Sequence, residues 1–363
     1  MAARVRLKMI LFGIFAVGLL NFFGVFTHIF EEDFDQSFHY PYDGDISEFI
    51  AQLRNKEKPS VSPINIYNIS FLSVGKKKCS VSEWGGLRLV YLVKSAVDHF
   101  EHRSAIRSTW GYEGRFSDVP IRTIFLLGVD PSRPELQDKL AEEQRKFGDV
   151  VQANFVDHYF NNTIKTMMGF KWVMENCLES QFYFFSDDDM YLSTRNVIRF
   201  LRNPSNYPEY LLAPLQHLDR LKRSVGRRSS LDYELPADVR LFSGFVFVSS
   251  PHRHYPSKWY VSLSEYKYDK WPPYVTAGAY VLSKNALIDM YYASMYTAHF
   301  RFDDIFLGIV AKKAGIEPYH CDEFNFYKKE YTPHSYRYVV ASHGFAPDEL
   351  RKVWAEQRSI GNA

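Results

Sequence analysis

The middle of this 363-residue chain alternates short apolar runs with stretches whose apolar residues recur at helical spacing. Four runs predict strands, at residues 87–93, 121–127, 150–155 and 182–185. Between them the spacing predicts helices at residues 102–110, 134–147 and 163–177. Because strands that alternate with helices pair in parallel, the pattern predicts an α/β fold with a mostly parallel sheet and flanking helices.

An almost unbroken apolar run near the N-terminus, residues 9–26, predicts a transmembrane helix if it continues to residue 30. Basic residues precede the run and acidic residues follow it, so the positive-inside rule keeps residues 1–8 in the cytosol. The remainder would then be lumenal, as in a single-pass type II membrane protein. A cleaved signal peptide is the alternative, but the run is long for one and no small-residue cleavage site follows it.

Residues 31–82 show no sustained periodicity and carry three prolines and a run of lysines. This composition predicts a lumenal stem that holds a folded domain away from the membrane. The folded domain is expected to occupy residues 83–363. Within it, the basic and polar segment at residues 214–240 predicts a surface loop.

Composition excludes some classes of protein. A hydrophobic fraction of 46% is ordinary for a globular chain, and a net charge of +2 gives no signature of nucleic-acid binding. Three cysteines without metal-type spacing permit one disulfide and one leftover thiol in an oxidising lumen: Cys79, Cys177 and Cys321. Two N-glycosylation tripeptides, at Asn68 and Asn161, fit the same lumenal placement.

Three consecutive aspartates, Asp187, Asp188 and Asp189, follow the predicted strand at residues 182–185. Adjacent carboxylates raise one another's pKa unless a cation or hydrogen-bond donors compensate. In open α/β sheets, ligands bind beyond the carboxyl ends of the strands, which is where these aspartates lie. Mg²⁺ and Mn²⁺ prefer oxygen ligands of this kind. The alternative is a solvated turn that caps the next helix.

A second acidic pair, Asp303 and Asp304, lies at the start of another predicted helix, where acidic residues often only complement the helix dipole. Upstream, residues 270–283 combine two prolines and several aromatic residues with Gly278, at which backbone can approach a ligand closely. Taken alone, both features leave ligand binding and a structural role open.

Seven motifs, in this order, resemble the β1,3-galactosyltransferase family, glycosyltransferase family 31. They are IRSTWG at 106–111, FLLG at 125–128, NNTIKT at 161–166, DDD at 187–189, PPYVTAGAYVLS at 272–283, FDDIFLGIVAKKAGI at 302–316 and SHGF at 342–345. The longer match WPPYVTAGAY is similar to members that transfer N-acetylglucosamine in invertebrate glycolipid synthesis. The resemblance implies a Golgi enzyme with a nucleotide-diphospho-sugar (GT-A-like) fold, which uses a UDP-sugar and Mn²⁺ and inverts the anomeric centre.

The resemblance also implies roles for single residues. Asp189 and His343 would hold Mn²⁺ or Mg²⁺, and Asp304 would be the catalytic base that takes the proton of the acceptor hydroxyl. The donor UDP-sugar would be contacted by Arg103, Arg107, Lys165, Asp187, Asp188 and Gly278. The acceptor would be contacted by Trp271, Tyr274 and Asp303. Taken singly, such cations are usually solvated and such aromatics usually belong to a core.

The chain departs from the family pattern at four places. Val275 stands where the family has a cysteine, which removes one possible disulfide, and Gly278-Ala279 replaces a glycine pair, which is expected to alter the donor pocket. The segment at residues 214–240 resembles an insertion, and Asp303 stands where the family has glutamate.

The resemblance predicts a metal-dependent β1,3-glycosyltransferase that moves an N-acetylhexosamine, foremost N-acetylglucosamine, to a mannose or galactose of a glycolipid. A galactosyltransferase acting on glycoprotein or proteoglycan-linker acceptors is a second hypothesis. A catalytically inactive, membrane-tethered lectin is a third, and an intact set of Asp189, Asp304 and His343 argues against it, because a binding protein needs no base.

Overall fold

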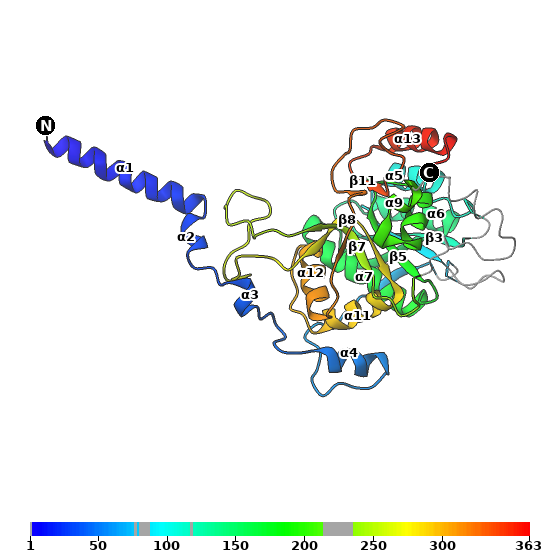
Figure 1. Ribbon diagram of the computed structural model, residues 1–363, viewed down its shortest axis with the longest axis horizontal. Helices are drawn as coiled ribbons and strands as arrows, with labels where there is room; N and C mark the ends of the chain where they lie inside the picture. Colours follow the sequence, from blue (N-terminus) through cyan, green and yellow to red (C-terminus); the bar gives the residue numbers. More distant parts are fainter. Residues whose placement is uncertain (1, 76–77, 80–87, 117–118, 213–234) are drawn as a thin grey trace.

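The computed structural model describes residues 2–75, 78–79, 88–116, 119–212 and 235–363 (Figure 1). Within them, an eight-stranded sheet has the order β1-β4-β3-β2-β5-β8-β7-β9. Its strands are β1 Phe71–Val74, β2 Leu89–Lys94, β3 Ile121–Val129, β4 Val150–Val156, β5 Phe182–Asp187, β7 Phe242–Phe247, β8 Tyr274–Ser283 and β9 Tyr319–His320. A small second sheet contains β6 Tyr191–Leu192, β10 Phe324–Asn325 and β11 Ala341–Ser342.

The centre of the large sheet is parallel, as the sequence predicts. Strand β2 pairs in parallel with both β3 and β5, and β3 pairs in parallel with β4. Strand β8 pairs antiparallel with β5 and β7, so the whole sheet is mixed. The sequence does not reveal β8, because Pro272 and Pro273 directly before it and Gly278 within it interrupt the strand pattern.

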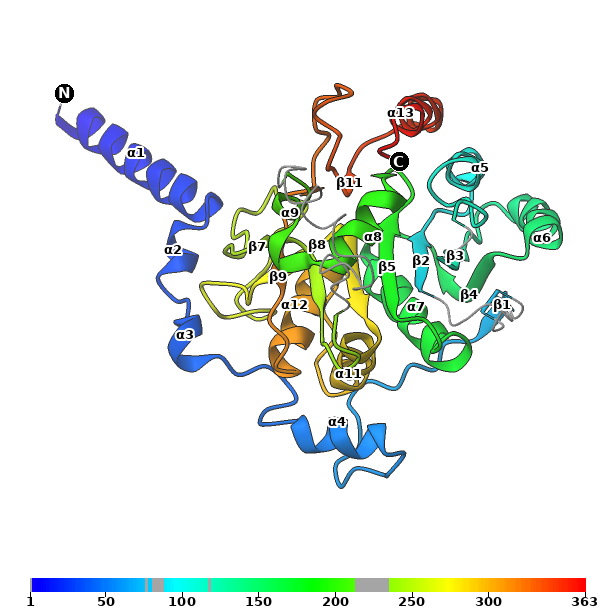
Figure 2. The same cartoon turned by 45° about the vertical axis from the view of Figure 1, so that its right-hand side comes forward.

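Helices cover both faces of the sheet (Figure 2). On one face lie α7 Asn162–Asn176, α11 Lys284–Met295 and α12 Asp303–Lys313; on the other lie α5 Phe100–Ser108, α6 Glu135–Phe147, α8 Thr194–Arg202 and α13 Pro347–Ser359. The two short elements η2 Pro204–Asn206 and α9 Glu209–Leu212 follow α8. In β2, Val90 and Leu92 join one core while Leu89, Tyr91 and Val93 join the other. This alternation buries the strand on both faces and fixes its register.

The N-terminal helix α1 Ala2–Phe22 extends away from the domain (Figure 1). Its residues Arg4–Phe22 are long and apolar enough to cross a membrane, and none of that window is buried. The helix begins before residue 9 and ends at Phe22, so it does not continue to residue 30. The chain instead turns at Gly24 into the short helix α2 Val25–His28.

Residues 31–75 pack on the domain, which corrects the expectation of a free stem. Phe34, Tyr40 and Phe49 are buried in the same core as α11 and α12. The segment includes α3 Phe34–Ser37 and α4 Ser47–Arg54, and β1 extends the sheet by pairing with β4. The reason is the segment's aromatic content, since exposed aromatic rings gain free energy by burial. We call residues 31–54 the N-terminal strap.

The disulfide left open by the sequence joins Cys79 to Cys177, 98 residues apart, and Cys321 is a buried free thiol. Burial raises the pKa of the Cys321 thiol to about 12. The bond ties the segment before β2 to the end of α7. The predicted surface loop at residues 214–240 lies outside the described residues as far as residue 234.

Candidate active site

A buried charge network lies where β2 and β5 end. Lys94 and Asp187 are the last residues of the two strands and are paired in register. The Nζ of Lys94 is 3.1 Å from Oδ1 of Asp187 and 2.9 Å from Oδ2 of Asp303, at the start of α12. The Thr166 hydroxyl donates to the same Asp303 oxygen at 2.9 Å. Carboxylates from two distant segments therefore meet on one lysine.

Sequence reasoning missed Lys94. The available signal was a lysine that ends the otherwise apolar run LVYLVK, because a buried lysine needs an anionic partner. Burial acts to lower the pKa of Lys94, but the charges of Asp187 and Asp303 outweigh it and raise that pKa. For Asp303, burial acts to raise the pKa, and Lys94 and Thr166 bring it below its usual value. Both groups are therefore ionised at neutral pH.

Asp304 differs sharply from its neighbour. Burial, and next the charge of Asp303, raise the pKa of the Asp304 carboxyl to about 7. Its Oδ1 accepts the backbone N–H of Ile305 at 2.8 Å. The pKa values of two adjacent carboxyls are thus shifted in opposite directions, as those of acid and base groups in active sites often are.

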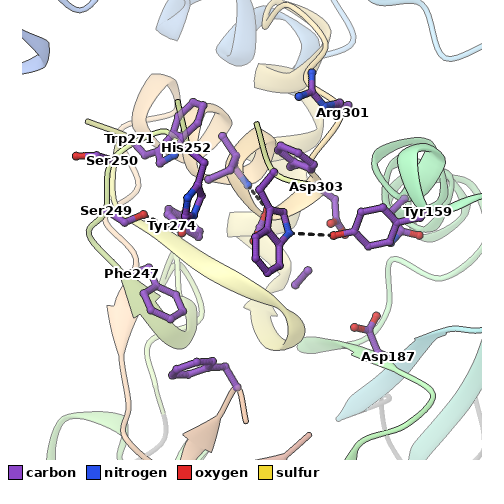
Figure 3. Close-up of a pocket in the computed structure, with 17 residues that line it drawn as sticks. Tyr159, Asp187, Phe247, Ser249, Ser250, His252, Trp271, Tyr274, Arg301 and Asp303 are labelled. Atoms are coloured by element: carbon purple, nitrogen blue, oxygen red, sulfur yellow. Dashed lines mark hydrogen bonds between the residues drawn. The ribbon is translucent and has the colours of Figure 1, made fainter. Parts of the chain in front are cut away.

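A cavity of about 480 Å³ opens beside these carboxylates (Figure 3). Asp187, Asp303 and Asp304 line it, and so do the predicted acceptor residues Trp271 and Tyr274. The remaining lining side chains were not predicted, and most are aromatic or polar: Tyr159, Asn162, Phe247, Ser249, Ser250, His252, Trp259, Ala277, Arg301, Phe302, Ile305 and Phe326. A space of this size with aromatic walls suits a sugar ring and its hydroxyls.

Two aromatic side chains form the mouth of this cavity. The indole N–H of Trp259 donates to the Tyr159 hydroxyl at 3.3 Å, and both side chains are nearly half exposed (Figure 3). Trp259 belongs to the segment between β7 and β8, whereas Tyr159 belongs to η1 Tyr159–Asn161, before α7. The sequence could not pair them because they are 100 residues apart.

Asp189 and His343 meet as the resemblance implies. The Nε2 of His343 is 3.2 Å from Oδ2 of Asp189, and the N–H groups of Gly344 and Phe345 donate to the Asp189 carbonyl. The other carboxylate oxygen, Oδ1, is buried and has no hydrogen-bond partner. A buried, unpaired carboxylate oxygen is costly, so the pair suits a divalent cation.

Among the described residues, no group of three His, Cys, Asp or Glu side chains is arranged to hold a metal. Asp189 and His343 supply two ligands, and water or substrate oxygens would have to supply the others.

Gly278 lies close to both Asp187 and His343. A methyl group at Gly278 would lie 3.7 Å from Oδ2 of Asp187 and 3.9 Å from Cδ2 of His343. These are ordinary contact distances, so a side chain would not clash with the protein. It would fill the space between Asp187 and His343, where the donor is expected.

Asp188 points to the loop after β2. Its Oδ2 accepts the Ser95 hydroxyl at 2.6 Å and lies 2.9 Å from Nδ1 of His99. Burial acts to raise the pKa of Asp188, but the hydrogen bonds of His99 and Ser95 lower it overall. Asp188 therefore fixes this loop as an ionised carboxylate and does not line the cavity.

Arg103 does not contact the cavity, which corrects its predicted role in donor binding. Its side chain has no exposed surface. All five N–H groups are used by the Glu143 carboxylate, the Ser95 hydroxyl and the carbonyls of Ala96 and Val97. Arg103 therefore holds the loop that carries Ser95.

Arg107 and Lys165 are also occupied by other groups. Arg107 forms a two-bond pair with Asp149, with both distances 2.8 Å. The Nζ of Lys165 donates to Asp157 at 2.6 Å and to the Ser95 carbonyl at 2.8 Å. Their positions in family-like motifs thus reflect support of the loops around the site, and neither side chain lines the cavity.

The glycosylation tripeptides lie in different surroundings. Asn68 is exposed, whereas the Asn161 amide donates to the Val156 carbonyl and Thr163 is fully buried. Asn161 also lies next to Asn162, which lines the cavity. Glycosylation at either position stays a prediction.

A carboxylate at the end of β5, two more at the start of α12 and an aromatic-walled cavity are the features expected of a site that transfers a sugar. The family model for galactosyltransferases matches residues 101–215 and 230–322. The chain belongs to the galactosyltransferase family and is a β1,3-glycosyltransferase.

Its relatives differ in the sugar that they are named for. The chain is 43% identical to "Beta-1,3-galactosyltransferase brn" of Drosophila melanogaster, over 95% of this chain and 94% of that one. It is 31% identical to "Lactosylceramide 1,3-N-acetyl-beta-D-glucosaminyltransferase B" of Danio rerio, over 81% and 70%. A solved glycosyltransferase of the PBCV-1 major capsid covers 73% of this chain and 97% of its own, with 10% identity and a TM-score of 0.35, too low to add to the argument.

Proposed function

We propose that the protein is an inverting, metal-dependent enzyme that moves N-acetylglucosamine from a UDP-sugar to a mannose or galactose of a glycolipid. The observation that carries the proposal is Asp304, whose carboxyl has a pKa of about 7 on the wall of a sugar-sized cavity. A general base is most effective when its pKa lies near the working pH.

In the proposed step, the acceptor hydroxyl oxygen attacks C1 of the donor sugar. The bond between C1 and the diphosphate oxygen breaks, and its electron pair leaves with UDP. Asp304 takes the hydroxyl proton and becomes neutral. Because a single displacement enters opposite the leaving group, the configuration at C1 inverts.

Asp189 and His343 are the residues proposed to hold Mn²⁺ or Mg²⁺, on the ground of the unpartnered Asp189 oxygen. When bound, the ion would neutralise the charge of the diphosphate. Asp187 and Gly278 border the same space, and they are proposed to contact the donor.

The acceptor is proposed to occupy the aromatic end of the cavity. Tyr274 is oriented by Ser249, with 3.0 Å between their hydroxyl oxygens, and its ring stacks on Phe247. Trp271 packs on Tyr266 and presents part of its ring to the cavity. Such flat faces bind the C–H surface of a sugar, which supports Trp271 and Tyr274 as acceptor contacts, with Asp303 positioning the base beside them.

We infer that α1 anchors the enzyme in the Golgi membrane, with a short cytosolic tail and a lumenal catalytic domain. Basic residues before the apolar helix and a disulfide beyond it support this orientation.

Transfer of galactose is the second candidate, favoured by the name of the Drosophila relative, a β1,3-galactosyltransferase. A test is release of UDP by the full chain from UDP-N-acetylglucosamine, UDP-N-acetylgalactosamine and UDP-galactose, each with mannosyl and galactosyl acceptors and added Mn²⁺. Turnover with UDP-N-acetylglucosamine alone is expected. Turnover with UDP-galactose alone would assign the second candidate, and UDP binding without any turnover would favour a binding protein.

A further inference from the structure

The end of the apolar helix α1 contacts the segment that carries the cavity's mouth. The ring of His254 stacks on Phe23, with centroids 5.4 Å apart, and meets Phe22 edge-on at 5.2 Å. Both views show the loop between β7 and β8, in yellow-green, beside α2 (Figures 1 and 2). The folded domain therefore contacts the last residue of the helix directly.

Gly24 makes this contact possible. Its φ of +75° is a conformation that L side chains rarely adopt, and a methyl group there would lie 2.5 Å from the carbonyl oxygen of Arg253. The backbone of the helix end is thus packed directly on the backbone of the loop.

A buried arginine fixes the arrangement. Arg253 has no exposed side-chain surface; its Nε–H donates to Glu31 at 2.7 Å. Its other nitrogens donate to the carbonyls of Val261, Tyr266 and Tyr268. One side chain therefore connects the first acidic residue after the helix to both halves of the loop. Removing one partner of such a pair is strongly destabilising, so the connection is rigid.

The same loop exposes apolar and aromatic side chains. Val248 is 73% exposed, Tyr255 58% and Trp259 46%, and the Nζ of Lys258 lies 4.4 Å from the Trp259 ring centre. Tyrosine, tryptophan and lysine are the residues that occupy the head-group region of a bilayer. Ile29 and Phe30, which follow the helix, are exposed as well.

We propose that residues 248–260 lie on the membrane surface, with Tyr255 and Val248 among the lipid head groups. The mouth of the cavity, formed by Tyr159 and Trp259, then opens at the bilayer, and the acceptor sugar is carried on a lipid of the same membrane. The surface is continuous with the membrane-spanning helix, which identifies its occupant as lipid. This inference rests on the proposed function and its membrane anchor.

The first test measures membrane contact. The full chain with Tyr255→Cys is labelled with an environment-sensitive fluorophore and placed in phosphatidylcholine nanodiscs that carry a head-group spin label. Labelling of the buried thiol Cys321 gives the background signal, which is measured on the unsubstituted chain. Tyr112→Cys is the matched control, because Tyr112 is 52% exposed and follows α5. Strong quenching at residue 255 and little at residue 112 is expected; equal quenching at both would overturn the proposal.

The second test measures transfer. Tyr255→Ser is expected to lower kcat/KM for a lipid-linked acceptor in nanodiscs roughly fivefold, the factor for half-burying one aromatic side chain, and to leave transfer to a water-soluble glycoside unchanged. An equal loss of kcat/KM with both acceptors, or no loss with either acceptor, would overturn the inference. Absence of transfer by the unsubstituted chain from every UDP-sugar would instead overturn the proposed function, while the quenching result would still stand.

Discussion

Lys94 and Asp303 are 209 residues apart in the chain, yet the Nζ of one lies 2.9 Å from Oδ2 of the other in a buried ion pair. The pair joins the end of a central strand to the start of α12. It keeps Asp303 ionised, and that charge in turn contributes to the raised pKa of Asp304. A structural ion pair therefore adds to the effect of burial on the pKa of the proposed base.

Lys94→Met is expected to lower the free energy of unfolding by about 3 kcal/mol or more, because it leaves the buried Asp303 carboxylate and the partly exposed Asp187 carboxylate without their cation. Thermal or denaturant unfolding of the purified chain measures the loss. Lys139→Met is the control, since Lys139 is exposed on α6. Equal stability of the two variants would show that the network contributes little.

Asp304→Asn is expected to reduce turnover by at least ~100-fold while UDP binding stays nearly unchanged, because the amide cannot accept the hydroxyl proton. Steady-state kinetics and calorimetric titration with UDP separate the two effects. Asp348→Asn, on an exposed helix turn, controls for a general effect of losing a carboxylate. Near-normal turnover of Asp304→Asn would remove Asp304 from the role of base.

The pH profile should report the same group. The base must be ionised, so kcat/KM is expected to fall about tenfold per pH unit below pH 7 and to level off above it. Asp303→Asn removes a charge that raises the Asp304 pKa and leaves the charge of Lys94, which lowers it. The midpoint of the residual activity is therefore expected to move to lower pH. A midpoint that stays in place would refute the electrostatic coupling of the two carboxyls.

The pH dependence of stability is opposite to that of activity. The folded-state pKa of Asp304 lies above its unfolded value, so its ionisation destabilises the fold as pH rises through about 7. Asp304→Asn should melt at a higher temperature than the unsubstituted chain at pH 8, with the difference shrinking between pH 7 and 4. Melting curves at a series of pH values measure it.

Asp189→Asn is expected to weaken Mn²⁺-dependent UDP binding, because it removes the charge of the carboxylate whose Oδ1 oxygen has no partner in the proposed metal site. His343→Gln should act in the same direction. Titrations of UDP with Mn²⁺ and with a chelator measure the difference. Asp322→Asn, which has a highly exposed side chain, is the matched control. Titration curves identical to the unsubstituted chain would exclude Asp189 from metal binding.

Phe49→Ala tests whether the N-terminal strap belongs to the domain. Phe49 is buried and its ring centroid lies 4.9 Å from that of Tyr296 on the domain. The variant is expected to lose about 3 kcal/mol of stability, as large-to-small core substitutions do. Phe30→Ala should lose little, because Phe30 is exposed. If the strap did not pack on the domain, the two variants would have the same free energy of unfolding.

The sequence by itself determined the central architecture. Strands β2 to β5 and helices α5 to α7 lie within a few residues of their predicted positions, because each is encoded by local periodicity. The same periodicity predicted that Asp187 lies at the end of a strand and Asp304 at the start of a helix. The motifs that resemble the family added the pairing of Asp189 with His343.

Only the tertiary structure decided which charges serve the site. Arg103, Arg107 and Lys165 match positions of the family, but their partners Glu143, Asp149 and Asp157 come from other segments. Lys94 and Arg253 were not predicted to matter, because their partners Asp303 and Glu31 also come from distant segments. The strap packs on the surface of the domain, and the shape of that surface determines which of its side chains are buried. Its sequence therefore shows no helix or strand periodicity. Long-range pairing of charges and rings is fixed by the fold, and spacing along the chain does not encode it.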